Sequence, residues 1–203
     1  MPKLLYQGHA SLRLISNKGV VVYVDPFAGE GYDLPADIVL ITHQHEDHNQ
    51  LGLVTLKPKA RVITELEAQT NGVYNTFRVR RVGVRAVPAT NDFHDPRECV
   101  GYIITIDGVK VYVAGDTSET DAMGEMIWMK LDYAFLPIDG VHNMDPINAS
   151  ICAARIGARH SVPYHMRSGE LFDMDMARRF DIPGRLILRP GEEIELEGMS
   201  IHP

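Results

Sequence analysis

Three histidines and two carboxylates fall within one short segment, His43–His48, which reads His-Gln-His-Glu-Asp-His. The segment follows the apolar run Ile38–Ile41, which is typical of a buried β-strand. Imidazole binds Zn, Fe, Ni and Mn well, and a carboxylate adds a hard, charged donor. A loop held by a rigid strand can turn such side chains inward, so chance clustering in a solvated loop is the weaker explanation. The expected metal ligands in this segment are His43, His45, Asp47 and His48.

Short runs rich in Val, Ile, Leu and Tyr surround this segment and predict β-strands that hold it. Asn17-Lys18-Gly19 and Asp107-Gly108 predict hairpin turns, and the second turn joins strands at Gly101–Ile106 and Val109–Ala114. The other strands expected in the first half are Ala10–Ile15, Val20–Asp25, Asp37–Thr42, Arg61–Thr64 and Arg78–Val87.

The second half of the chain alternates strands with helices. Ser118–Asp121 resembles a capping box, which predicts a helix from there to about Lys130. Asp145-Pro146 is typical of a helix start and Gly157 of a helix end. This order indicates two sheets with helices outside them, in a single domain over residues 1–203. The remaining expected elements are helices at Ile147–Ile156 and Asp173–Phe180 and strands at Asp132–Pro137, His160–Pro163, Leu186–Leu188 and Glu193–Leu196.

Composition and charge narrow the class of protein. The 203 residues, 45% of them hydrophobic, are enough for one sizeable core. A net charge of −7 makes nucleic-acid binding unexpected, and the Arg/Val alternation over Arg78–Arg85 is typical of the solvent face of a strand. Two cysteines form no disulfide framework, and no secretory or membrane-spanning segment is expected. We therefore expect a cytoplasmic protein that acts on a small molecule, with homo-oligomer formation left open.

Further motifs follow the metal-binding segment in a set order. The segment His43–His48 has the form H-x-H-x-D-H, Gly115-Asp116-Thr117 follows a predicted hairpin strand, and His165 follows a later strand. Gly8–Ser11 and Asp25–Phe27 lie nearer the N-terminus. Together these motifs resemble the metallo-β-lactamase superfamily. The likeness extends to its short single-domain branch, typified by ascorbate-6-phosphate lactonase and uncharacterised metal-dependent hydrolases.

The resemblance implies a mixed α/β fold, a four-layer αββα sandwich with the metal site at one edge of its two sheets. It also implies one or two divalent metal ions, with Zn expected and Mn, Ni or Fe as alternatives. In such enzymes a hydroxide between the metals attacks the substrate, because each cation lowers the pKa of bound water. The expected reaction is hydrolysis of an ester-like bond, in a lactone or a phosphodiester, and the small substrate can be anionic.

The resemblance also gives each residue a role. Asp47, Asp116 and His142 are the expected catalytic residues, and His142 lies on a loop that borders the active site in the family. In the family pattern the first metal is held by His43 and His45, the second by Asp47, His48 and His165, and both by Asp116.

One ligand position departs from the family pattern. The superfamily usually supplies a third histidine to the first metal, and Val87–Asn91 here places asparagine at that position. An amide oxygen is a weak ligand for transition metals. His94 is the candidate replacement, because Asn91 and Asp92 both favour the turn that would bring it back. The alternative for His94 is an exposed loop histidine.

Other residues are candidates for supporting roles. His9 fits a hydrogen bond to a ligand carboxylate, with a structural histidine as the alternative. Arg167 could hold a phosphate or carboxylate, although a plain exposed arginine is the more common case. His160 and His202 are expected at the surface.

Two other function classes stay open. The same fold carries iron in persulfide dioxygenases and flavodiiron proteins, so a non-heme iron oxidoreductase is one alternative. The single-iron type would need a third histidine in place of Asn91 beside His43, His45 and Asp116. A non-catalytic metal-binding module or sensor is the other alternative, and the retained ligand set argues against it.

Overall fold

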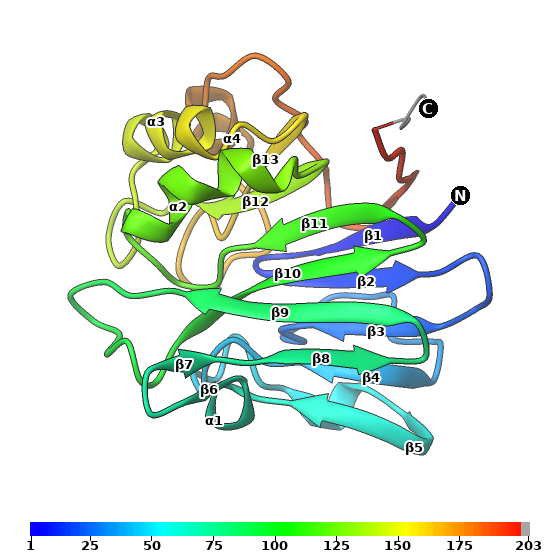
Figure 1. Cartoon of the computed structure of the whole chain (residues 1–203). Coiled ribbons are helices and arrows are strands. Elements are labelled where there is room, and N and C mark those ends of the chain that lie inside the picture. Colours follow the sequence, from blue (N-terminus) through cyan, green and yellow to red (C-terminus); the bar gives the residue numbers. More distant parts are fainter. Residues whose placement is uncertain (200–203) are drawn as a thin grey trace.

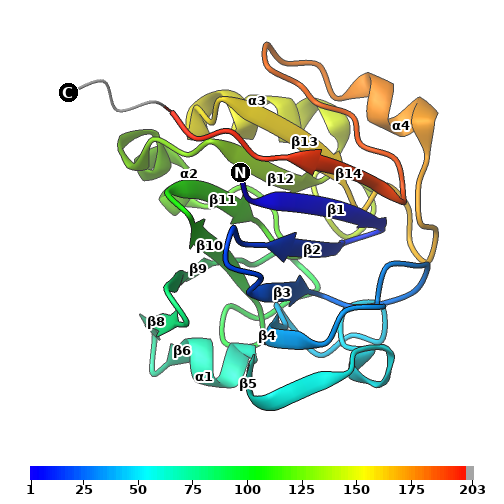
Figure 2. The same ribbon diagram turned by 90° about the vertical axis from the view of Figure 1, so that its right-hand side faces the viewer.

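The computed structural model describes residues 1–199 and contains two large β-sheets that pack face to face (Figure 1, Figure 2). The first sheet has the order β14-β1-β2-β3-β4-β5, with antiparallel pairs from β14 to β3 and parallel pairs from β3 to β5. Its strands are β1 (Lys3–Gly8), β2 (Ser11–Ile15), β3 (Val21–Val24), β4 (Ala36–Leu40), β5 (Leu56–Ile63) and β14 (Glu192–Glu195).

The second sheet repeats this mixture of pairings. Its order is β13-β12-β11-β10-β9-β8, and only the pairs among β11, β12 and β13 are parallel. Its strands are β8 (Thr76–Val79), β9 (Val82–Pro88), β10 (Val100–Ile106), β11 (Val109–Val113), β12 (Tyr133–Pro137) and β13 (His160–Tyr164). A small ribbon of β6 (Gln69–Thr70) and β7 (Val73–Tyr74) stands apart from both sheets.

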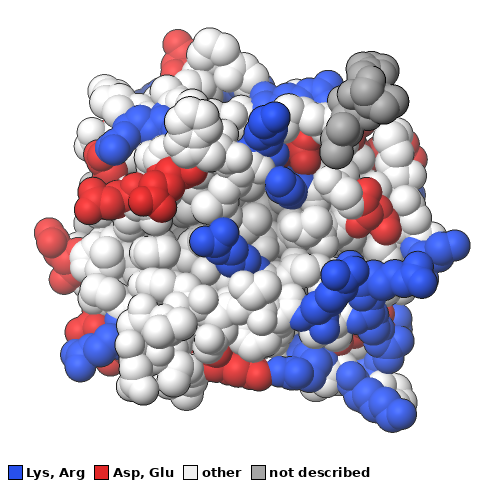
Figure 3. Space-filling model, in the orientation of Figure 1, with Lys and Arg blue, Asp and Glu red and all other residues white. Residues whose placement is uncertain are grey.

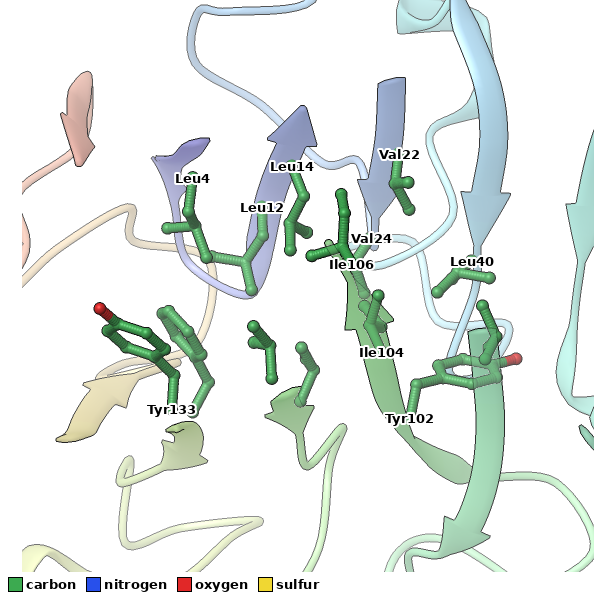
Figure 4. Packing of buried hydrophobic residues seen from close by; sticks show 14 of the residues in the cluster. Leu4, Leu12, Leu14, Val22, Val24, Leu40, Tyr102, Ile104, Ile106 and Tyr133 are labelled. Carbon is green, nitrogen blue, oxygen red and sulfur yellow. The ribbon is translucent and has the colours of Figure 1, made fainter. Parts of the chain in front are cut away.

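An apolar core fills the space between the two sheets, where side chains from both sheets face one another (Figure 4). On β4, Ile38 and Leu40 point into this core while Val39 belongs to a cluster on the opposite face. On β10, Ile104 points inward and Ile103 outward. Successive side chains of a strand point to opposite faces, so these uninterrupted apolar runs are explained by burial on both sides.

The helices of the second half of the chain cover the outer face of the second sheet, where a second apolar cluster lies (Figure 1). The outer face of the first sheet is covered by loop residues, among them Tyr32, Leu34 and Val54. The mixed α/β architecture of two packed sheets expected from the sequence is confirmed. The helical segments are α1 (Glu65–Ala68), α2 (Asp121–Glu125), α3 (Pro146–Ile156), α4 (Met174–Arg179) and the 3-10 helices η1 (Leu51–Leu53) and η2 (Met126–Met129). No helix of the described chain is long and apolar enough to cross a membrane.

Several element predictions are confirmed by local geometry. The turn at Asp107-Gly108 joins β10 to β11 as expected. The Asp145 side chain accepts hydrogen bonds from the backbone N–H groups of Ile147 and Asn148, which caps α3. Gly157 ends the same helix in the left-handed conformation. The helix α4 and the strands β12, β13 and β14 also lie where the sequence placed them, within a residue or two.

Other element predictions are wrong. The strand predicted over Arg78–Val87 is a hairpin, because Arg80 and Arg81 both adopt positive φ and form the turn between β8 and β9. The predicted capping box makes no cap hydrogen bond: the helix starts at Asp121 and tightens into η2. The predicted strand Leu186–Leu188 is absent from the described sheets, and the strand β1 was not predicted. His202 lies outside the described residues.

The core between the sheets should dominate the free energy of unfolding. Ile104 is fully buried there, so Ile104→Ala leaves a cavity and should lower the unfolding free energy by about 2–5 kcal/mol in urea titrations. Ile147, on the solvent side of α3, is 69% exposed, and Ile147→Ala is the control, expected to change stability by under about 0.5 kcal/mol. Similar losses in the two variants would contradict this placement of the core.

Candidate metal centre

Loops that follow strands of both sheets bring the predicted ligands to one place. The segment His43–His48 follows β4 of the first sheet. Asp116 follows β11 and His165 follows β13, both of the second sheet. His94 lies in the loop between β9 and β10. The site therefore forms only where the two sheets pack together.

The first group of donors consists of His43, His45 and His94, whose ligand atoms all lie within 4.8 Å of one another. His94 Nε2 is 3.0 Å from His45 Nδ1, and the His94 ring meets the His43 ring edge to face at a centroid distance of 4.6 Å. His94 is buried rather than directed to solvent. The structure therefore places His94 beside the first two histidines, as its predicted replacement role requires, with Asn91 Oδ1 facing His94 Nδ1.

The second group consists of His9, Asp47, His48 and His165, again with ligand atoms within 4.8 Å. Asp116 lies between the two groups. Its Oδ1 atom is 3.3 Å from His48 Nε2 and 3.4 Å from His165 Nε2, while its Oδ2 atom is 3.7 Å from His94 Nε2. Asp116 also groups with His43 and His48. One carboxylate thus presents an oxygen to each group, which is the geometry of a bridging ligand.

Unpaired atoms show that this cluster fits metal ions. Among residues 1–199, several buried donor atoms of the cluster make no hydrogen bond. An unpaired buried polar atom costs about 1–3 kcal/mol, and a divalent cation would satisfy several such atoms at once. A set of imidazoles with two carboxylates is also a normal donor set for zinc and related metals. The unpaired atoms are Nε2 of His43 and His48, both ring nitrogens of His165 and Oδ1 of Asp116.

In four of the histidines the Nδ1 atom, which is the ring nitrogen remote from the site, faces an oxygen. The Nε2 atom of each is then free for the site. Such partners fix the tautomer and ring orientation of a metal-binding histidine. The partner of His48 is Asp25, whose carboxylate also accepts from the backbone N–H and hydroxyl of Thr42. The Nδ1–oxygen distances are 3.0 Å for His43 to Thr42, 2.9 Å for His48 to Asp25, 2.8 Å for His94 to Asn91 and 3.0 Å for His165 to Asp139.

His9 is fully buried and contacts the second group. Its Nδ1 atom is 3.0 Å from the carbonyl oxygen of Glu170, and its Nε2 atom is 3.0 Å from Asp47 Oδ2. The carbonyl and the carboxylate can both only accept, so neutral His9 donates from Nδ1 to Glu170 and turns the Nε2 lone pair toward Asp47 Oδ2. A cation between these two atoms would satisfy both. The predicted contact with a ligand carboxylate is present, and His9 is also a further potential donor to a metal.

Metal binding requires neutral imidazoles and ionised carboxylates. Burial opposes protonation of His48 and His165, but Asp116 outweighs it and raises the pKa of both, so a cation would displace protons there. Burial, with the nearby His48 adding to it, lowers the pKa of His43 to about 2. Burial alone would raise the pKa of Asp116, but the neighbouring His165 and His48 outweigh it and lower that pKa well below its usual range. Burial likewise opposes ionisation of Asp139, but contact with His165 and backbone N–H donors lower its pKa.

Gly115 makes the turn that directs Asp116 into the cluster. Its φ of +69° is in the left-handed region, and a Cβ atom there would lie 2.7 Å from the carbonyl oxygen of Val100. The next residue but one, Thr117, donates from its hydroxyl to the carbonyl of Thr90 and accepts from the Thr90 backbone N–H. These bonds tie the turn after β11 to the loop that carries His94.

A cavity of about 350 Å³ opens over the cluster. His142 lines it at the mouth, where its ring meets the Phe93 ring edge to face at 4.7 Å. His142 is thus placed beside the metal ligands but not among them. Arg167 does not line the cavity, because it forms an ion pair with Asp173. The lining residues are His45, Asp47, Phe93, His94, Asp116, His142, His165 and Ser168.

Sequence reasoning missed Asp25 and Asp139, the partners of His48 and His165. Both are acidic residues placed at or just after the end of a buried strand, β3 or β12. That position was the available signal, because a carboxylate there lies at the same sheet edge as the ligand loops.

The chain matches a family model and is similar to known metal-dependent hydrolases. Residues 3–165 match the model of the β-lactamase superfamily domain. A UPF0173 metal-dependent hydrolase from Methanoculleus marisnigri is 34% identical, with 96% of each chain covered. A structure of a proposed metal-dependent hydrolase from Parabacteroides distasonis aligns with a TM-score of 0.72 and 27% identity over 90% of each chain. The fold is also that of Igni18, a metallo hydrolase from Ignicoccus hospitalis, with a TM-score of 0.75, 24% identity and coverage of 97% of this chain and 99% of that one.

The position of His94 predicts its effect on metal content. His94→Ala removes one of three imidazoles of the first group, so it should lower occupancy of the first metal and leave the second nearly full. His160→Ala is the control, because that imidazole stacks on Tyr133, away from both donor groups. Metal content is measured by mass spectrometry after dialysis. Wild-type metal content in His94→Ala would show that His94 is not a ligand.

Proposed function

The chain belongs to the metallo-β-lactamase superfamily and is a metal-dependent hydrolase, and we propose that it cleaves an ester-like bond in a small molecule. The proposed substrate is a lactone or a phosphodiester. The proposal rests on the placement of Asp116 between the two histidine groups. Its Oδ1 atom faces the unpaired Nε2 atoms of His48 and His165, and its Oδ2 atom lies 3.7 Å from His94 Nε2. A divalent cation held there supplies a Lewis acid and makes water a competent nucleophile near neutral pH.

Different residues of the chain would bind the metals, orient the ligands and transfer a proton. His43, His45 and His94 would hold the first metal, with Asp116 shared between the two metals. The second metal would be held by Asp47, His48 and His165, with His9 as a further donor. The nitrogen-rich donor set favours zinc, with manganese, nickel or iron as alternatives.

His142 is the proposed proton donor to the leaving group. Its imidazole lies in the mouth of the cavity without contacting the donor groups, so it could reach a substrate oxygen there. Phe93, which is 59% exposed and touches His142, forms an apolar wall beside it. Asp47 and Asp116 are proposed as the other catalytic residues, because both line the same cavity.

The charge distribution supports a small substrate rather than nucleic acid. Among the described residues, no Lys or Arg lines the cavity. Basic side chains gather instead on the side of the molecule where β8 turns into β9 (Figure 3), a turn formed by the exposed Arg80 and Arg81. A cavity of about 350 Å³ suits a small molecule. Homo-oligomer formation and a cytoplasmic location stay predictions.

Substitution of the shared ligand tests the proposal. Metal-loaded protein should hydrolyse members of a panel of lactones and phosphodiesters, whereas Asp116→Ala and His48→Ala should reduce turnover to background. Both variants should fold, because neither side chain belongs to the apolar clusters. Asp175→Ala is the control and should keep full turnover, since that side chain is 86% exposed on α4.

Near-normal turnover in Asp116→Ala, or equal turnover by metal-free protein, would exclude the proposed mechanism. Full metal content without turnover on any substrate of the panel would favour a binding module. Oxygen consumption in the iron-loaded form would favour an oxidoreductase.

A further inference from the structure

A chain of hydrogen-bonding side chains connects the two donor groups outside the metal ligands themselves. It starts at His94, whose Nδ1 atom is 2.8 Å from Asn91 Oδ1. The Asn91 amide donates to Asn143 Oδ1 at 3.1 Å, and the Asn143 amide donates to Asp139 Oδ2 at 2.7 Å. The last link is a close contact between a carboxylate and an imidazole: the same Asp139 oxygen lies 3.0 Å from His165 Nδ1.

The direction of each hydrogen bond follows from the fixed groups along this chain. The backbone N–H of Phe93 donates to Asn91 Oδ1 at 2.8 Å, so that atom of the amide must be oxygen. The Asp139 carboxylate can only accept, so the Asn143 atom facing it must be nitrogen. His94 Nδ1 faces an oxygen and therefore carries the proton. Its Nε2 lone pair is left for the first metal.

Asp139 is the most firmly held residue in this series of side chains. Its Oδ1 atom accepts from three successive backbone N–H groups, those of Val141, His142 and Asn143, at 2.7, 2.9 and 3.1 Å. These bonds hold the loop after β12 closed around the carboxylate. The other oxygen, Oδ2, is thereby fixed toward both Asn143 and His165.

We propose that Asn91, Asn143 and Asp139 form a positioning bridge that orients the ligands His94 and His165 together. Asn91, at the position where the family supplies a histidine ligand, supports His94 in that role instead of binding metal. The two metal sites are then connected by three hydrogen bonds and one carboxylate–imidazole contact, and a change at Asp139 weakens both. The inference rests on the proposed function only in requiring two metal sites, and not on the substrate or the reaction.

Two isosteric changes separate the two ends of the bridge. Asp139→Asn keeps an oxygen for the three backbone donors but turns an amide N–H toward Asn143 and His165, so both of those contacts are lost. The affinity of each site for metal should fall about 10–100-fold, the usual effect of losing such partners. Asn91→Leu removes the acceptor for His94 and Phe93 and the donor to Asn143, all at the first-site end, so the first site alone should weaken. Asn91→Asp loses only the donor to Asn143 and keeps the acceptor for His94, so it should bind the first metal more tightly than Asn91→Leu does.

The measurement is a titration of metal-free protein with Co²⁺, followed by visible absorption, with bound metal counted by mass spectrometry. The absorption bands of bound cobalt report ligand geometry, which a general loss of stability would not shift. Asp145→Asn is the matched control: it removes a carboxylate on the same loop, the cap of α3, without touching either histidine. It should leave both affinities and the spectrum unchanged, because asparagine is also a good cap.

The bridge is wrong if folded Asp139→Asn binds both cobalt ions as the unsubstituted protein does, or loses only one site. It is also wrong if Asn91→Asp behaves as Asn91→Leu does. Asn91 is half-buried in a loop outside the apolar clusters, so variants at this position should fold. Comparison of Asn91→Leu with Asn91→Asp therefore tests the bridge even if Asp139→Asn fails to fold. Cobalt binding is read without substrate. Failure of the bridge is therefore distinct from failure to hydrolyse ester-like bonds.

Discussion

The burial of imidazoles and carboxylates in one small volume, with several donor atoms unpaired, is the constraint on which the rest of the site depends. Leaving such groups without partners in a low-dielectric interior is unfavourable. A cation in the middle of the cluster, with oxygen atoms behind it, would satisfy these groups. Asp25, Asn91 and Asp139 provide those oxygens, each facing the Nδ1 atom of one histidine. With the far nitrogens held, the Nε2 atoms of His48, His94 and His165 can turn only inward.

The fold meets this constraint by setting strand ends of two sheets against each other. The core between the sheets fixes where β4, β11 and β13 end, and the ligand loops follow directly from those ends. Gly115 permits the sharp turn that carries Asp116 inward, and Thr117 ties that turn to the loop of His94. Rigid packing below and hydrogen bonds behind leave little freedom to the ligands. The cavity above them is free to accept a substrate.

Much of the site could be predicted from sequence because its donors are concentrated. The spacing of the donors in His43–His48 indicates a metal site. The mixed α/β fold follows from the family pattern that includes Gly115-Asp116-Thr117. Asp139 could not be found in this way, because His165 approaches it, and Asn91 connects to it through Asn143, only by the packing of separate loops. The same limit applies to the β8–β9 hairpin. Two arginines at positive φ give no turn signal in sequence, and the pairing of the strands overrides their preference.

We propose that two cations share Asp116, with His94 and not Asn91 completing the first site. Anomalous diffraction from crystals grown with zinc tests it most directly, because the signal locates metal atoms without reference to any assumed ligand. The account predicts two peaks, one beside the imidazoles of His43, His45 and His94 and one beside Asp47, His48 and His165, with Asp116 in contact with both. Two results would contradict it: a single peak that Asp116 does not touch, or a first metal bound by Asn91 with His94 turned away.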